Sequence, residues 1–503
     1  MRKAKQYVCT VLALMMFTSG AAISQTATGL DRLKAGIEKL KKDESLSTAA
    51  WGVMVMEATT GKEIASYNPH QSLMTASTMK TITSGAALSI LGPDFRFETK
   101  IETDGKVDGA GVLNGNIFIR GGGDPTLGFE RIQGNATLPE LMQEWTAAIR
   151  ATGIKSITGS VIADGSIFEE AMAPSTWPWS DLGNYYGAGA CGLSIHENLY
   201  FLTFKYGPNI GDTTTITKCE PEIPGMVFHN RVTVGPSSIG DQAFLYGTEY
   251  AYLRHIRGTL PQGITEYAIK GAIPDPELFA AQSLTIALRS AGTTISGNPS
   301  TMRILKNEGQ ISSYRKTRIL LQVHKSPPLN DIVYWLNKKS VNLYAEHLVK
   351  YLGYRKYGQG TNFHGTLAIT EYWKSKGIST LGFRMADGSG LSRNNGITPA
   401  QMAEILSVMS KDSSYAEYLL SLPVAGVADD PGGWGNFGKG TPAASNLRAK
   451  SGFIAGVRGY AGYFKSKSGK LCCFSMLANN HTCGVSDMRI KFQDLMLLMV
   501  ELE

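Results

Sequence analysis

The chain has 503 residues, a formal net charge of +7 at pH 7, 43% hydrophobic residues and 18% charged residues. This length can bury a sizeable core and corresponds to about three domains, or to one domain with large insertions. The positive charge is too mild to indicate a nucleic-acid-binding protein. Beyond residue 24 no stretch is long and apolar enough to cross a bilayer, so an integral membrane protein is not indicated.

The first 24 residues have the pattern of a secretory signal. Arg2, Lys3 and Lys5 precede the apolar run VCTVLALMMF, and small residues offer a cleavage site between Ser24 and Gln25. A retained membrane anchor is the alternative, and the shortness of the apolar run argues against it. We therefore expect a secreted mature chain without a transmembrane anchor. Peripheral contact with a membrane stays open.

Five of the six cysteines lie beyond this signal, at Cys191, Cys219, Cys472, Cys473 and Cys483. No C-x-x-C pair and no metal-like histidine spacing occur, so we expect neither a metal nor a cofactor. Cys191 and Cys219 are either a disulfide or two buried thiols, and the sequence does not decide between them. Cys472 and Cys473 lie in an apolar, strand-like run and are expected to fill the core on opposite sides.

The first elements along the chain are two strands and a helix. Residues 51–68 predict a strand, a turn at Gly61 and a second strand. The helix that follows contains Ser77 and Lys80 and ends near Gly92. From about 95 to 305, Gly-rich turns separate short β-like runs, and a helix over 275–292 closes this stretch.

The last part of the chain is helical and then β again. Two helical pieces fill 327–353, a further helix begins near Thr398, two or more strands follow around 447–480, and an amphipathic helix ends the chain. This order predicts an α+β fold. Residues 25–95 and 306–503 would form one antiparallel sheet flanked by helices. Residues 96–305 would be an inserted, mostly-β region of two nested domains.

The stretch MTASTMKTITSGAAL places Ser77 and Lys80 three residues apart on one helical face. A base-activated serine needs a hydroxyl, a group that accepts its proton and donors for the oxyanion. A lysine near its ordinary pKa of about 10.4 is protonated and cannot act as the base. Burial or a second cation nearby would favour the neutral amine. The same pattern also opens ordinary helices, so it does not establish a catalytic pair by itself.

Short motifs of this kind recur by chance, and their context separates them. Ser340-Val341-Asn342 lies between two helical pieces, where polar side chains can face a cleft. Lys450-Ser451-Gly452 opens a strand, where small residues let a ligand backbone approach. The competing S-x-N matches, Ser66–Asn68 and Ser392–Asn394, lie in predicted loops, and the competing K-S-G match, Lys467–Gly469, lies in a predicted hairpin turn. A second S-x-x-K occurs at Ser313–Lys316.

In this order the three motifs resemble those of the penicillin-recognising serine enzymes. The wider match resembles the D-alanyl-D-alanine carboxypeptidase/endopeptidase family, the low-molecular-mass class C penicillin-binding proteins. It covers most of the mature chain and includes GNIFIRGGGDPTLG, KKSVNLYAE, DGSGLSRNNGITP, SLPVAG and AKSGFIAGVRGYAGY. The long insert between the first and second motifs is similar to the family's inserted domains. The resemblance implies a penicillin-binding/β-lactamase-like transpeptidase domain.

The resemblance also implies a role for each motif residue. Ser77 would be the acylated nucleophile, Lys80 its base, and Ser340 a proton relay toward the leaving group. Asn342 would hold the substrate amide, and Lys450 would attract the terminal carboxylate and favour neutral Lys80. The backbone N–H groups of Ser77 and Phe453 would form the oxyanion hole. Ser451 and Gly452 complete the predicted substrate-binding strand.

The third motif departs from the family pattern at two positions, and Thr75 and residues 427–441 depart from it as well. Ser451 stands where the family usually has threonine, which keeps the hydroxyl. Phe453 stands where a small or hydroxyl residue is common, which puts a side-chain contact to the substrate carboxylate in doubt. RGGGDPTLG lacks the ending of a phosphate loop, so we interpret it as a structural turn. Asp164 and Asp387 are candidates either for substrate contact or for turn capping.

The resemblance therefore implies a periplasmic serine D-Ala-D-Ala carboxypeptidase or DD-endopeptidase. Its substrates would be peptidoglycan stem peptides, and β-lactam antibiotics would inhibit it by acylating Ser77. Two alternatives remain. A serine β-lactamase shares the motifs, although no clear Glu-bearing loop for deacylation is evident. A catalytically inactive relative would bind peptidoglycan without turnover.

Overall fold

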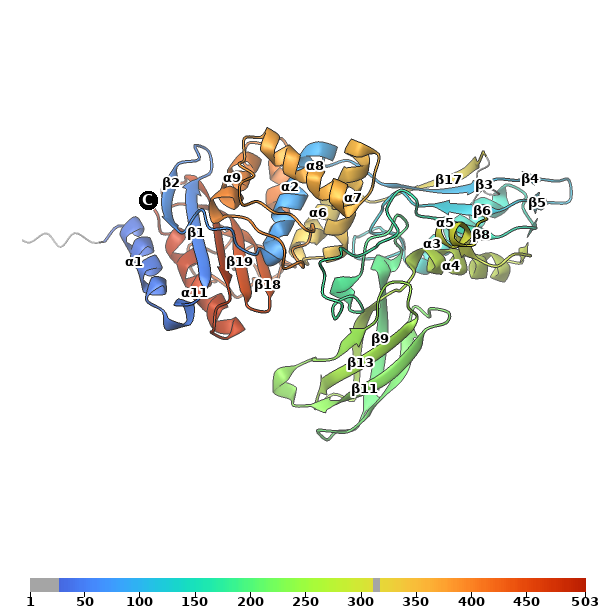
Figure 1. Ribbon diagram of the computed structural model, residues 1–503, viewed down its shortest axis with the longest axis horizontal. Coiled ribbons are helices and arrows are strands. Elements are labelled where there is room, and N and C mark those ends of the chain that lie inside the picture. The colour runs from blue at the N-terminus through green and yellow to red at the C-terminus, as the bar shows by residue number, and fades with distance from the viewer. Residues whose placement is uncertain (1–26, 311–316) are drawn as a thin grey trace, which may run out of the picture.

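The computed structural model describes residues 27–310 and 317–503, and Figure 1 shows three regions. A central sheet with helices on both faces carries the two ends of the described chain. A second region of sheets and helices lies beside it, and a β-sandwich extends away from both. The predicted signal segment and the pattern Ser313–Lys316 lie outside the described residues.

The central sheet joins the beginning and the end of the chain. Its five strands have the order β18-β19-β20-β1-β2, and neighbouring strands are antiparallel. Their bounds are β1 Ala50–Glu57, β2 Glu63–Tyr67, β18 Arg448–Ile454, β19 Val457–Lys465 and β20 Leu471–Asn479. Because β1 pairs with β20 along its whole length, residues far apart in sequence form one layer, as the sequence predicted.

Helices cover both faces of this sheet (Figure 1). One face packs against α1 Gly29–Lys41 and α11 Val485–Met499. The other packs into a helical layer of α2 Met79–Leu91, α6 Leu329–Lys338, α7 Asn342–Tyr357, α8 Asn362–Ser375, α9 Pro399–Met409 and α10 Tyr415–Ser421. Cys472 and Cys473 are buried in these two opposite cores, as the alternation of a strand requires.

The first part of the insert contains two sheets and three helices. One sheet has the order β16-β8-β6-β3-β17, and the other has the order β15-β7-β5-β4. The strands are β3 Glu98–Thr103, β4 Lys106–Val107, β5 Val112–Asn114, β6 Ile117–Arg120, β7 Ser156–Ile157, β8 Val161–Asp164, β15 Thr294–Ile295, β16 Ser300–Thr301 and β17 Ile319–Lys325. The helices are α3 Leu138–Ala151, α4 Pro276–Ser290 and α5 Met302–Asn307.

One predicted boundary differs in the structure. The sequence predicted that the chain returns to the first domain at residue 306, yet β17 pairs antiparallel with β3 in the sheet of the insert. The described residues between 306 and 325 therefore lie with the insert. No position of β17 is fully buried, and its short sequence ILLQVHK does not indicate which sheet the strand joins.

The second part of the insert is a sandwich of two three-stranded sheets. The orders are β10-β9-β14 and β11-β13-β12. The strands are β9 Leu199–Tyr206, β10 Thr214–Glu220, β11 Val227–Gly235, β12 Phe244–Tyr246, β13 Leu253–Pro261 and β14 Glu266–Ala272. Alternate residues such as Leu202, Phe204, Val232 and Ile256 fill its core.

Two further observations concern the whole described chain. The five cysteines in residues 27–310 and 317–503 are all free thiols, so Cys191 and Cys219 do not form a disulfide. Within those same residues, no helix combines the length and the apolar character that a bilayer crossing needs.

Candidate active site

Ser77 lies in a short 3₁₀ turn, Ala76–Thr78, that leads directly into α2. Ala76 has a φ of 44°, a left-handed conformation that costs a non-glycine residue roughly 1–3 kcal/mol. The Thr78 hydroxyl donates to the Thr75 carbonyl at 2.7 Å and helps to hold the turn. The turn places Ser77 at the start of α2, where backbone N–H groups have no partner within the helix and favour negative charge.

Lys80 is the centre of the site's hydrogen bonds. Its Nζ lies 3.0 Å from Ser77 Oγ, 2.6 Å from Asn342 Oδ1 and 2.7 Å from the Ser389 carbonyl oxygen. A neutral amine has two N–H groups and one lone pair. It can donate to the amide and the carbonyl oxygens while its lone pair faces the Ser77 hydroxyl. This is the geometry that a general base for Ser77 requires.

The surroundings of Lys80 shift its pKa toward neutrality. The side chain is fully buried, and burial lowers its pKa from 10.5 to about 7, although Asp387 and Glu346 act in the opposite direction. Lys450 is also buried, and its pKa lies well below 10.5 because of burial and of repulsion by Lys80 and Arg458. The lowered pKa of Lys80 is thus due to burial, and the expected effect of Lys450 on Lys80 stays a prediction.

Ser340 and Asn342 lie at the junction of α6 and α7. Asn342 opens α7, and its Nδ2 donates to the Tyr186 carbonyl at 2.7 Å while its Oδ1 accepts from Lys80. Ser340 has a φ of 57°, so a second left-handed, non-glycine residue lies in the site. Such strain persists where the surrounding structure imposes it, and it is frequent in active sites.

The third motif lies on the edge strand β18. Lys450 and Gly452 share one strand face, and Ser451 and Phe453 hold the alternate positions. A Cβ on Gly452 would lie 2.7 Å from the Thr75 carbonyl oxygen and 3.0 Å from the Ser77 backbone nitrogen, so only glycine lets the strand lie this close to the nucleophile turn. The Phe453 side chain is 46% exposed and contacts the Arg458 guanidinium.

The loop 386–395 closes the site, and Asp387 holds its shape. Asp387 is fully buried and accepts hydrogen bonds from the backbone N–H groups of Gly390 and Ser392 and from Asn395 Nδ2. Trp177 Nε1, from the insert, donates to the same carboxylate at 2.8 Å. Asp387 therefore caps a turn, one of the two roles expected for it. The turn aims the Ser389 carbonyl at Lys80.

Sequence reasoning missed three residues of the site. Glu346 is buried one helical turn after Asn342, and its carboxylate accepts from the backbone N–H groups of Gly388 and Ser389. Its spacing of four from Asn342 on one helix face was a usable signal. Tyr186 and Trp177 come from the insert, and no local pattern relates them to the cleft.

The glycines of RGGGDPTLG form a structural turn, as the sequence analysis proposed. Gly123 has a φ of 83°, and its carbonyl oxygen lies 2.8 Å from His347 Nδ1 on α7. His347 Nε2 lies 2.8 Å from Ser194 Oγ. Burial lowers the pKa of His347 to about 3, so the ring is neutral and can donate at Nδ1 and accept at Nε2. The turn therefore fastens the insert to α7.

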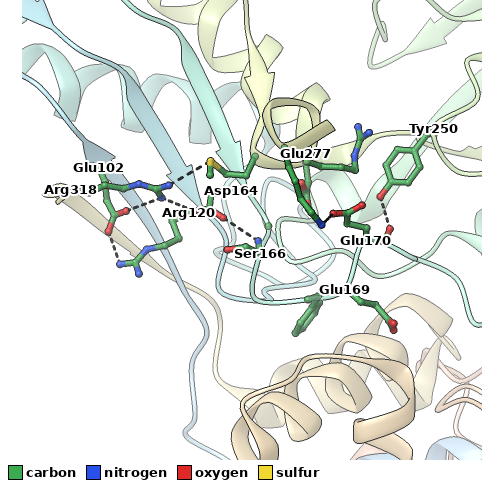
Figure 2. Close-up of a pocket in the computed structure, with 14 residues that line it drawn as sticks. Glu102, Arg120, Asp164, Ser166, Glu169, Glu170, Tyr250, Glu277 and Arg318 are labelled. Atoms are coloured by element: carbon green, nitrogen blue, oxygen red, sulfur yellow. Dashed lines mark hydrogen bonds and ion pairs between the residues drawn. The ribbon is translucent and has the colours of Figure 1, made fainter. Parts of the chain in front are cut away.

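A cavity of about 920 Å³ is lined by residues of the insert, between Glu102 and Arg318, and Ser77 is not among them (Figure 2). Its charged side chains are largely paired with one another. Arg318 contacts Asp164 at 2.6 Å and Glu102 at 3.6 Å, and Lys306 contacts Glu170 at 2.7 Å. Asp164 thus binds Arg318 and accepts from the Ser166 backbone N–H, so it holds a turn, one of the two roles expected for it.

The comparison with protein families covers most of the chain. Residues 33–498 match the D-Ala-D-Ala carboxypeptidase 3 (S13) family. The chain belongs to this family. Membership confirms the enzyme class that the motifs indicated, a serine-type D-Ala-D-Ala carboxypeptidase.

Individual relatives match over similar lengths. The D-alanyl-D-alanine carboxypeptidase DacB of Haemophilus influenzae is 28% identical over 430 residues, which are 85% of each chain. The D-alanyl-D-alanine carboxypeptidase of Actinomadura sp. is 27% identical over 493 residues, covering 96% of this chain and 87% of the relative. The crystal structure of penicillin binding protein 4 (dacB) from Haemophilus influenzae aligns with a TM-score of 0.78 at 25% identity, over 93% of this chain and 99% of that chain. This likeness confirms the predicted fold class.

Proposed function

We propose that this S13 family member cleaves peptides ending in D-Ala-D-Ala through an acyl-enzyme at Ser77. The observation that carries the proposal is the 3.0 Å contact between Ser77 Oγ and a buried Lys80 whose two other contacts are hydrogen-bond acceptors. In its neutral form the amine would turn its lone pair to the hydroxyl, and a pKa of about 7 keeps a large fraction of the amine neutral at pH 7.

The reaction has two halves. In the first, Lys80 takes the Ser77 proton, Ser77 Oγ bonds to the penultimate carbonyl carbon, and the C–N bond to the terminal D-Ala breaks. The proton passes to the departing amine, and Ser340 would relay it. In the second, water adds to the acyl carbon, the ester bond to Ser77 breaks, and the hydroxyl is restored. The Ser77 and Phe453 N–H groups stabilise the oxyanion in both halves.

Substrate recognition rests on the strand and helix that flank Ser77. Lys450 lies buried without an acidic partner of its own among the described residues, and burial together with repulsion by Lys80 and Arg458 lowers its pKa. The terminal carboxylate of a substrate would restore its charge and form a strong, desolvated ion pair. The Asn342 amide would contact the substrate amide, while Ser451 and Gly452 would border the peptide along β18.

The partners follow from this chemistry. We propose peptidoglycan stem peptides as substrates and β-lactam antibiotics as acylating inhibitors, with a location outside the cytoplasm, in the periplasm. A complex of the Haemophilus influenzae penicillin binding protein 4 with a β-lactam supports the second point by analogy of fold. Cleavage of D-amino-acid cross-bridges, the endopeptidase reaction, would use the same groups.

The test follows the intact-protein mass after addition of benzylpenicillin. We expect one lasting adduct on the wild type and none on Ser77→Ala, because the nucleophile is removed. Ser66→Ala is the matched control, since Ser66 lies on β2 within another S-x-N pattern and its hydroxyl donates to Glu63. Release of D-Ala from a D-Ala-D-Ala peptide should likewise occur with the wild type and Ser66→Ala and be lost with Ser77→Ala.

Other results would change the proposal. An adduct that disappears while nitrocefin is consumed at steady state would indicate a serine β-lactamase. An unmodified wild type that binds muropeptides without releasing D-Ala would indicate the inactive binding protein. Retention of peptidase activity in Ser77→Ala would refute the nucleophile assignment.

A further inference from the structure

The outer face of the sheet β11-β13-β12 carries an ordered array of cationic and aromatic side chains. β11 and β13 are parallel, and residue pairing places His229 opposite His255 and Arg231 opposite Arg257. β12 continues both rows, with Tyr246 opposite His255 and Phe244 opposite Arg257. We call this array, Val227, His229, Arg231, Leu253, His255, Arg257, Phe244 and Tyr246, the outer sheet face.

The side chains of the outer sheet face are open to solvent. Val227 is 51% exposed, Leu253 40% and Phe244 39%, and the two histidines and two arginines are exposed as well. The residues between them, such as Arg254 and Ile256, point inward and are buried. Large apolar side chains gathered on one exposed sheet face, rather than scattered singly, mark a binding surface.

The charges on this face also lack compensation. No acidic residue stands at any position of the outer sheet face. Arg231 and Arg257 lie directly opposite each other, and like charges in such a pair destabilise a sheet. An anionic ligand would remove this repulsion, because an arginine guanidinium binds carboxylates through paired hydrogen bonds.

A single segment links this face to the active site. Trp179 is 66% exposed and its ring contacts that of Tyr246, with centroids 5.3 Å apart. Two residues earlier, Trp177 donates to Asp387, and seven residues later the Tyr186 carbonyl accepts from Asn342. The segment Trp177–Tyr186 therefore contacts residues of the cleft at both ends and the sandwich through Trp179.

We propose that the outer sheet face binds the glycan strand of peptidoglycan while the cleft acts on its peptides. Aromatic rings and the apolar row would lie against sugar rings, and the arginines would pair with the carboxylates of neighbouring stem peptides. Alternate positions over five residues of β11 span about 13 Å, which suits a polymer better than a small molecule. This inference rests on the proposed function, because it extends the same substrate.

The experiment measures co-sedimentation of the full chain with purified peptidoglycan sacculi. We expect Arg231→Ala combined with Arg257→Ala to weaken binding about fivefold or more, since two individually modest charge contacts are lost. Lys205→Ala combined with Lys218→Ala is the matched control. It removes the same charge from exposed positions on β9 and β10 of the same sandwich, so sacculus binding should not change.

A second variant separates the aromatic contribution. Phe244→Ala should weaken binding even at high salt, where the arginine contacts are screened. Hydrolysis of a soluble D-Ala-D-Ala peptide and acylation by benzylpenicillin should stay unchanged in all these variants. These two assays also report on the proposed function itself, so its failure would be seen there and not in sedimentation alone.

Three outcomes would overturn the inference. One is unchanged sacculus binding by both the arginine and the Phe244 variants. Another is that the arginine and Phe244 variants keep sacculus binding but lose binding to vesicles of phosphatidylglycerol and phosphatidylcholine, which would assign the face to a membrane surface. The third is a dimer in light scattering that the arginine variant dissociates while sacculus binding is kept, which would assign the face to a second copy of the chain.

Discussion

At the scale of a single residue, two effects act on the pKa of Lys80 in opposite directions. Burial lowers its pKa to about 7, while the carboxylates of Asp387 and Glu346 raise it. The Asp387 carboxylate accepts hydrogen bonds within its own loop, and the Glu346 carboxylate accepts from two backbone N–H groups. Neither carboxylate forms a hydrogen bond with the Lys80 amine. The amine is therefore close enough to neutrality to act as a base, and still positioned by its acceptors.

This arrangement predicts the pH dependence of acylation. The neutral amine is the active form, so the second-order rate of acylation by benzylpenicillin should rise about tenfold per pH unit below 7 and level off above it. Stopped-flow measurements from pH 5 to 9 would test this. Lys80→Arg should reduce the rate by at least about 10²-fold at every pH, because a guanidinium keeps its proton. A rate independent of pH across this range would exclude Lys80 as the base.

At the scale of elements, the site depends on how closely β18 lies against the turn before α2. Gly452 makes this contact possible, since the atoms nearest to its missing Cβ belong to the backbone of Thr75, Ser77 and Thr78. Backbone atoms cannot move aside as a flexible side chain can. Any enlargement at Gly452 must therefore shift the strand relative to the nucleophile and distort the oxyanion hole.

We accordingly expect Gly452→Ala to lower the acylation rate about 10²-fold, in line with the effect of a displacement of roughly 1 Å in an active site. The melting temperature should change little, because the strand sits at the edge of the sheet. Gly109→Ala is the control, since a Cβ there meets no atom within 4 Å. Normal acylation by Gly452→Ala would show that β18 does not limit the geometry of the site.

At the scale of the whole molecule, the insert is part of the active site. The Trp177 indole holds the loop of Asp387, and the Tyr186 carbonyl orients Asn342. His347 on α7 fastens the insert from the other side, through Gly123 and Ser194. The cavity shown in Figure 2 lies within the insert, where ion pairs of Arg318 join β8 and β3 to the start of β17.

This coupling predicts that Trp177→Phe impairs both stability and catalysis. The ring is kept, but the buried Asp387 carboxylate loses a donor, which costs about 1–3 kcal/mol. Calorimetry should show a lower melting temperature, and kcat/KM on a soluble D-Ala-D-Ala peptide should fall about tenfold as the loop loosens. Trp179→Phe is the matched control, because that indole is 66% exposed and stands two residues away. Equal effects of both substitutions would show that the hydrogen bond to Asp387 is unimportant.

Much of the fold and of the site could be predicted because the signals are local. The spacing of Ser77 and Lys80 needs only one helical turn, and the apolar alternation of Cys472 and Cys473 needs only one strand. The S-x-N and K-S-G motifs could be chosen among their competitors by the elements around them. The return of the chain at β17 was placed wrongly, because a short strand pattern does not indicate that its partner is β3.

The sequence by itself determined the three motifs, their order, the α+β layout and the family. Only the tertiary structure decided what surrounds them: the carbonyl of Ser389 on Lys80, the indole of Trp177 on Asp387 and the approach of Gly452 to Ser77. It also decided that the exposed rows of β11, β13 and β12 share one face. These facts are distances between residues far apart in the chain. They depend on how separately folded layers pack, which no local periodicity records.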